Sequence, residues 1–146
     1  MKKLAVHKVL INAPLETVWD KLLDWKTWNV WDKGMKSIKF DGPLELGAKG
    51  KIDLGKGLTS TLVVTDFNPQ NSYESEFKLF GSRFVFDHVV ESAAHCTLVT
   101  FRVSAEGTFA DIFSLYMMAS FGEKLPQWMD NMKRFIENKA DRRIEE

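Results

Sequence analysis

Hydrophobic and polar residues alternate with a period of two through much of the chain after residue 37. In the run 73–79, for example, the odd positions are Tyr, Ser, Phe and Leu, and the even positions are Glu, Glu and Lys. This period places successive side chains on opposite faces of a strand. Together with an apolar run near the start, the pattern predicts seven strands with one buried face, at 4–12, 37–41, 46–54, 58–67, 73–80, 82–92 and 95–105. Short turn-forming links such as Asn68-Pro69 separate them, so we expect antiparallel neighbours.

The last quarter of the chain, from Thr108 to about Arg143, follows a helical period instead. Apolar residues recur every three or four positions, and the stripe contains Phe109, Ile112, Phe113, Tyr116, Leu125, Trp128, Met129, Met132, Phe135 and Ile136. Thr108 and Asp111 resemble a capping box at the start of this helix. Pro126 cannot donate a hydrogen bond to Gly122, so a kink or a boundary between two helices is expected there.

Two shorter helical segments are predicted between the first and second strands. Leu15, Val18, Trp19, Leu22 and Leu23 follow at helical intervals after Pro14, which suits a first helical turn. Trp25, Trp28 and Trp31 come next at intervals of three. These tryptophans either pack as core or as a plug between elements, or one of them closes a cavity.

This order of elements predicts an α+β fold in one domain spanning residues 1–146. A twisted antiparallel sheet with one apolar face can wrap around a long amphipathic helix. The predicted architecture is therefore a seven-stranded curved antiparallel sheet around a long C-terminal helix, with two short helices between strands 1 and 2.

On particular residues the chain resembles the START-related (SRPBCC) superfamily with the helix-grip fold, and within it the polyketide cyclase/dehydrase-like family. The similarity spans nearly the whole chain. The positions on which it rests are Ile11-Asn12-Ala13-Pro14, Glu16, Val18, Trp19, Leu23-Asp24, Trp28 or Trp31, Gly47, Gly50, Asn68-Pro69, Thr97, Val99 and Leu125 to Glu137. The resemblance implies a cavity between sheet and helix for sterols, lipids, polyketides or other apolar molecules. It implies no shared catalytic motif, and members include binding proteins, cyclases, dehydratases and proteins that act on chaperones.

Composition and charge narrow the function classes. The chain has 146 residues, 45% of them hydrophobic, which excludes a disordered protein. Twenty basic and twenty acidic residues cancel, so no global charge points to nucleic acid or to an acidic membrane surface. One cysteine, Cys96, excludes an internal disulfide. With neither a signal peptide nor a membrane span recognisable, we expect a cytoplasmic protein without integral membrane association.

His88 is the candidate polar residue of most interest. Parity along 83–92 places it on the same face as Phe84, Phe86 and Val90, where an imidazole could orient a ligand carbonyl or act as general acid or base. A hydrogen-bonded histidine in a partly wet core, or the opposite parity, are the alternatives. His7, His88 and His95 lack the spacing of metal ligands, so we expect neither metal nor cofactor.

Tyrosines and methionines complete the candidate site. Buried phenols such as Tyr73 and Tyr116 need a hydrogen-bond partner, which a ligand could supply, although structural roles are the alternative. Methionines near Met117 suit an irregular apolar ligand, or simply form core. Alternation places Glu76 outside, whereas Arg83 would be an anchor only if it pointed inward. The ligand-binding candidates are His88, Phe86, Phe84, Tyr73, Phe77, Phe101, Ile112, Tyr116, Met117, Ser120 and Trp128.

Three functions are compatible with these features. The first is binding of a small hydrophobic or aromatic ligand between sheet and helix. The second is a cyclase or dehydratase that uses the same cavity, with His88 and a tyrosine transferring protons. The third is a chaperone cofactor or other protein-interaction domain with a filled interior and an exposed apolar patch, for example at Trp25, Trp28 and Trp31.

Overall fold

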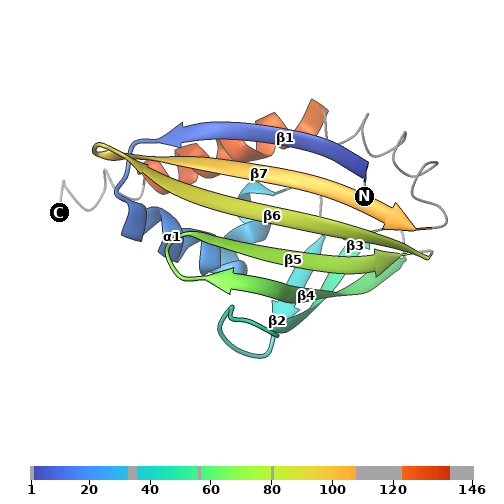
Figure 1. The fold of residues 1–146 in the computed structure, drawn as a ribbon. Coiled ribbons are helices and arrows are strands. Elements are labelled where there is room, and N and C mark those ends of the chain that lie inside the picture. Colours follow the sequence, from blue (N-terminus) through green and yellow to red (C-terminus); the bar gives the residue numbers. More distant parts are fainter. Residues whose placement is uncertain (1, 33–35, 56, 80, 108–122, 139–146) are drawn as a thin grey trace.

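The computed structural model describes residues 2–32, 36–55, 57–79, 81–107 and 123–138. It shows one curved sheet with helices on one side (Figure 1). The strands are β1 (Lys2–Ile11), β2 (Ser37–Phe40), β3 (Lys49–Gly55), β4 (Leu58–Asn68), β5 (Ser72–Leu79), β6 (Ser82–Ala93) and β7 (Cys96–Gly107). Between β1 and β2 lie α1 (Leu15–Leu23), the 3-10 helix η1 (Trp25–Thr27) and α2 (Trp28–Trp31). Residues 123–138 are helical.

The strands pair in the order β1-β7-β6-β5-β4-β3-β2, and every pair is antiparallel. Strands β2 to β7 therefore form a meander, and β1 returns to pair with the last strand. This confirms the predicted seven-stranded antiparallel sheet and the predicted helix-grip architecture. The pairing of β6 with both β5 and β7 has no register shift, so the inner and outer positions of β6 alternate strictly.

The bounds of every strand differ from the prediction by one to three residues at one or both ends, and the starts of the third and first strands are two examples. The third strand begins at Lys49 rather than at residue 46, because Gly47 has a φ of 83° and the Ala48 amide donates to the Glu45 carbonyl in a turn. The first strand begins at Lys2 rather than at Leu4, since Lys2 lies opposite Ala105 of β7.

The apolar stripe of helix 123–138 faces the sheet, as predicted. Leu125, Trp128, Met129, Met132 and Ile136 are all buried, together with inner-face residues of every strand. The remaining part of the predicted helix, 108–122 and 139–143, lies outside the described residues. Pro126 falls within the helical range 123–138, and the predicted kink between Gly122 and Pro126 therefore stays a prediction.

Two polar contacts fasten helix 123–138 to the end of β1. The Asn12 amide donates to the Glu137 carboxylate over 2.8 Å, and Lys133 Nζ donates to the Leu10 carbonyl over 2.7 Å. Lys133 and Glu137 also form an ion pair at 2.7 Å. These contacts satisfy backbone groups at the exposed edge of the sheet and set the helix against β1.

The three tryptophans between β1 and β2 pack as a plug. Trp28 and Trp31 are buried, and Trp28 Nε1 donates to the Leu22 carbonyl over 2.8 Å. Trp25 and Trp28 both contact Phe40, with ring centroids 5.7 and 6.1 Å away. The exposed apolar patch that a protein-interaction domain would need is therefore not formed by Trp28 and Trp31.

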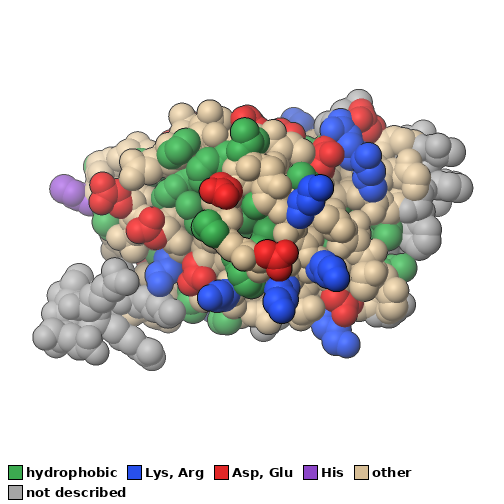
Figure 2. Space-filling model, turned by 90° about the horizontal axis from the view of Figure 1, so that it is seen from below, with side chains coloured by type: hydrophobic (Ala, Val, Ile, Leu, Met, Phe, Trp, Pro, Cys, Tyr) green, Lys and Arg blue, Asp and Glu red, His purple; other side chains and the backbone are tan. Residues whose placement is uncertain are grey.

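The outer face of the sheet carries the charged residues. Arg83 points outward, between Glu76 at 2.7 Å and Glu106, so it is not an anchor for an interior ligand. Glu76 lies outside, as the alternation predicted. On the lower face of the molecule, basic and acidic side chains are interspersed rather than gathered by sign (Figure 2).

Candidate ligand-binding site on the inner face of the sheet

A row of ring side chains crosses the concave face of the sheet. Strand register places Tyr73 opposite Phe67 on one side and His88 on the other, His88 opposite Phe101, and Phe101 opposite His7. Five consecutive strands, β4, β5, β6, β7 and β1, each contribute one ring. The row follows directly from strand pairing, because residues opposite each other in a sheet share a face.

His88 lies at the middle of this row. Its imidazole stacks on the Tyr73 ring with centroids 4.2 Å apart and planes 12° apart, and it meets the Phe101 ring at 4.4 Å and 79°. The residue is only partly buried, yet Nδ1 is sealed from solvent and has no hydrogen-bond partner among the described residues. Burial lowers the pKa of His88 to about 4, against a smaller opposing effect of the Tyr73 backbone, so the ring is neutral at pH 7.

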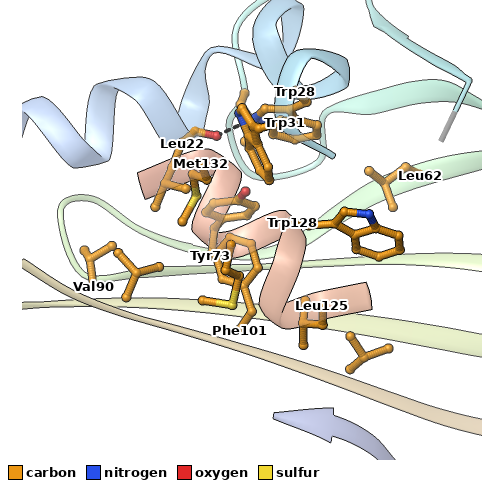
Figure 3. Close-up of a cluster of buried hydrophobic side chains, with 14 of the residues drawn as sticks. Leu22, Trp28, Trp31, Leu62, Tyr73, Val90, Phe101, Leu125, Trp128 and Met132 are labelled. Atoms are coloured by element: carbon orange, nitrogen blue, oxygen red, sulfur yellow. Dashed lines mark hydrogen bonds between the residues drawn. The ribbon is translucent and has the colours of Figure 1, made fainter. Parts of the chain in front are cut away.

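Tyr73 is buried and keeps its proton. Burial raises the pKa of its phenol, and the carboxylate of Asp32 raises it further. The ring also contacts Trp19 edge-on, with centroids 6.1 Å apart. In Figure 3 the hydroxyl points toward the side of the site that carries Trp28 and Trp31, which agrees with the influence of the adjacent Asp32.

A second row, nearer the other end of the sheet, is also aromatic. Phe77 stacks on Phe84 and on Phe86, with centroids 5.2 and 5.5 Å apart and both pairs of planes 20° apart. Ser75, opposite Phe86, is buried, and a serine there leaves more room than a large apolar residue would. Phe84 is fully buried, but Phe86 is only partly buried.

The incomplete burial of His88 and Phe86 is the feature that marks a site. Both side chains are on the inner face of β6, the strand third from the β1 edge, where the core would otherwise be closed. Their neighbours Phe84 and Val90 on the same face are 0% and 3% exposed. His88 and Phe86 therefore keep accessible surface on the concave apolar face, between neighbours that are closed to solvent.

The short helices and helix 123–138 cover this face. Trp31 contacts Phe101 with centroids 6.4 Å apart. Figure 3 shows Leu125, Trp128 and Met132 on helix 123–138, in one cluster of buried side chains with Tyr73 and Phe101. These surroundings are apolar, and the inner positions of β4, β5, β6 and β7 hold no Lys, Arg, Asp or Glu.

The structure brings together seven of the eleven candidates. Six of them, Phe77, Phe84, Phe86, Tyr73, His88 and Phe101, share the inner face, and Trp128 lies on the helix that covers it. Ile112, Tyr116, Met117 and Ser120 lie outside the described residues. Their assignment to the site, like the ligand-binding role of the other seven, remains a prediction.

Sequence reasoning left out three neighbours of the site. Phe67 belongs to the row because a register shift between Val64 and Asp66 turns it inward, and strict alternation does not include such a shift. Asp32 acts on Tyr73 from a segment 41 positions earlier in the chain, since 73 − 32 = 41. His7 shares the row only because β1 pairs with β7, which no local pattern indicates.

The geometry supports apolar contact and a small number of neutral hydrogen bonds. Among the described residues, no group of three or more His, Cys, Asp or Glu side chains is placed to hold a metal ion. None of the described helices combines the length and the apolar character that crossing a bilayer requires. The neutral imidazole of His88 and the protonated phenol of Tyr73 are the polar groups central to the row.

Solved structures of similar fold come from several bacteria. DynU16, a protein of the dynemicin biosynthetic locus, is 18% identical with a TM-score of 0.70; the similarity covers 91% of this chain and 46% of that one. The present chain thus spans about half the length of DynU16. CalU16 from Micromonospora echinospora is 18% identical with a TM-score of 0.64, covering 90% and 72%. The hypothetical protein jhp0584 from Helicobacter pylori is 14% identical with a TM-score of 0.73, covering 89% and 85%.

At these identities the solved structures establish the fold alone. Comparison with curated proteins gives no match. A family model described as polyketide cyclase / dehydrase and lipid transport matches residues 4–137, which includes every described strand except the first two residues of β1. The chain therefore belongs to the polyketide cyclase / dehydrase and lipid transport family.

Proposed function

We propose that this protein binds a small hydrophobic or aromatic molecule, lipid-like or polyketide-like, between the concave face of the sheet and helix 123–138. The observation that carries the proposal is the partial exposure of His88 and Phe86 at the centre of the apolar inner face. The family description, which includes lipid transport, and the fold support the same conclusion.

Burial of apolar surface would supply most of the affinity. A planar ligand of aromatic side-chain size buries about 200 Å², which at about 25 cal/mol per Å² corresponds to about 5 kcal/mol. That energy corresponds to a dissociation constant in the sub-millimolar range, and a larger ligand would bind more tightly. Stacked rings such as Phe77 and Phe86 offer flat surfaces against which an aromatic ligand can lie.

Native mass spectrometry after incubation with a cellular lipid extract tests binding directly. The protein is expected to retain a small apolar molecule, and the neutral fluorophore N-phenyl-1-naphthylamine is expected to bind with enhanced emission. His88→Trp should fill accessible space on the inner face and weaken fluorophore binding. Val89→Trp, on the outer face of the same strand, is the matched control and should leave it unchanged. Retention of nothing, and no fluorophore binding, would refute the proposal.

A catalytic role in the same cavity is the second candidate. It is favoured by one observation, the direct contact of a neutral imidazole with a protonated phenol in His88 and Tyr73. A general base must be unprotonated and an acid must hold its proton, and these two groups satisfy that requirement at pH 7. Conversion of an aromatic polyketide precursor by the wild type but not by His88→Phe or Tyr73→Phe would support catalysis. Equal conversion by all three proteins would exclude it.

A further inference from the structure

We propose that the ligand is uncharged at the end that meets His88, and that His88 selects a hydroxyl, carbonyl or amide group there against a carboxylate. The inference rests on the proposed binding function and deepens it by naming the chemistry of the ligand. It makes His88 a specificity-determining residue and excludes aryl or fatty carboxylates bound with the acid group at this position.

The packing of the imidazole determines where a ligand can approach it. Tyr73 covers one face of the imidazole, with ring centroids 4.2 Å apart. The Phe101 ring meets the imidazole nearly at right angles, with centroids 4.4 Å apart. Nδ1 is sealed, so the accessible part of the side chain lies elsewhere on the ring. A ligand therefore meets an edge of the imidazole rather than its stacked face, and an edge is where a ring nitrogen forms a hydrogen bond.

The charges around this edge favour a neutral partner. Inner positions of β4, β5, β6 and β7 carry no Lys or Arg, and Lys2, opposite Ala105, lies exposed at the start of β1. The buried side chains of helix 123–138 are Leu, Trp, Met and Ile. The carboxylate of Asp32 raises the pKa of the Tyr73 phenol, and Tyr73 stacks on His88, so a negative charge acts on this side of the site. A ligand carboxylate would lose its hydration here without gaining a cation, and it would lie near a second carboxylate.

A hydroxyl or an amide of the ligand can form a hydrogen bond with either tautomer of the neutral imidazole. The neutral ring has one nitrogen that donates and one that accepts. Because Nδ1 is sealed, Nε2 is the nitrogen left for a ligand, and a hydroxyl or an amide can complement it whether it donates or accepts. A carbonyl complements the donor. The hydrogen bond would also give a polar end to a ligand whose remaining surface lies against Phe77 and Phe86. The site would thus bind an aromatic or polycyclic molecule in one orientation.

Competition between matched ligands tests the inference. 2-Naphthamide and 2-naphthoate have nearly the same shape and differ in charge, and each would displace bound N-phenyl-1-naphthylamine at pH 7. We expect the amide to bind at least about 10-fold more tightly than the carboxylate, because the carboxylate loses its hydration without gaining a cation. His88→Phe keeps a ring at this position and removes the nitrogens, so it should reduce the advantage of the amide over the carboxylate about 10-fold, with the fluorophore affinity measured separately for each variant. His95→Phe, in the turn between β6 and β7, should retain the wild-type preference.

The outcomes separate this inference from the proposed function. If the fluorophore binds but naphthoate competes as well as naphthamide, the inference is overturned and ligand binding stands. The same holds if His88→Phe leaves the advantage of the amide over the carboxylate unchanged. If the wild-type protein binds neither the fluorophore nor either competitor, the proposed function fails and the inference fails with it.

Discussion

The neutral state of His88 predicts a specific dependence of stability on pH. Burial lowers its pKa from 6.5 to about 4 in the folded protein. When pH falls below 6.5 the unfolded chain binds a proton at this side chain, whereas the folded protein does not until pH approaches 4. Stability must therefore fall across this window, because protons bind preferentially to the unfolded state. Above pH 6.5 both states are neutral and the effect vanishes.

The size of the effect follows from the shift. A change of about 2.5 pKa units corresponds to about 3 kcal/mol once the pH is below both values, and to about 2 kcal/mol at pH 5. His88→Phe keeps a ring against Tyr73 and Phe101 but has no proton to bind. The difference in unfolding free energy between variant and wild type should therefore increase by about 2 kcal/mol, in favour of the variant, between pH 7.5 and pH 5.

Urea unfolding at a series of pH values, followed by tryptophan fluorescence, measures this difference. Carboxylates titrate in both proteins, so comparison of the two curves removes their contribution. His95→Phe changes a histidine in a turn and should follow the wild-type curve. Parallel curves for His88→Phe and wild type from pH 7.5 to pH 5 would show that the imidazole is not neutral and buried as described.

Three further substitutions test the fold that surrounds the site. Gly107→Ala should lower the free energy of unfolding by about 2 kcal/mol in thermal denaturation. Gly107 has a φ of 127°, and an added Cβ would meet backbone atoms of Gly81 and Ser82. Gly42→Ala is the control and should change stability little, because an added Cβ there has no heavy atom within 4 Å. Burial raises the pKa of Glu137, but hydrogen bonds from Lys133 and from the end of β1 lower it below its ordinary value. The contribution of Glu137 to the free energy of unfolding is therefore lost as pH falls. Glu137→Gln should lower this free energy by less than about 1 kcal/mol at neutral pH, and urea unfolding of the variant should show a weaker decrease of stability with falling pH. Trp28→Phe removes a buried 2.8 Å hydrogen bond to a carbonyl of α1 and should cost about 1 to 3 kcal/mol by urea denaturation; unchanged stability would contradict its role in the plug.

Local patterns predicted those parts of the site where strands are regular. The inward direction of His88 followed from parity because β6 pairs with both neighbours without a register shift. The same reasoning placed Tyr73 and Phe77 inside and Glu76 outside. Phe67 was not identified, since a bulge in β4 reverses the parity before it. Periodicity therefore predicts a face only as far as the next irregularity.

Contacts between distant segments could not be predicted from the sequence. The effect of Asp32 on Tyr73 depends on how α2 turns toward the sheet, and neither segment carries a signal for the other. The start of β3 was placed too early because Leu44 and Leu46 continue an alternating pattern, although Gly47 adopts a turn conformation. The stack of His88 on Tyr73 required the register of two strands, which hairpin length alone does not determine.

The attachment of helix 123–138 to the end of β1 affects how the chain can fold. The Asn12–Glu137 hydrogen bond joins residues 125 positions apart. Among the described strands, β1 pairs with β7 alone. During synthesis the first strand must therefore wait until β7, Cys96–Gly107, has left the ribosome before it can pair. Such long sequence separations slow folding, and they leave apolar strand faces exposed to aggregation in the interval. We expect refolding in the millisecond-to-second range, with truncation before β7 leaving β1 without a partner.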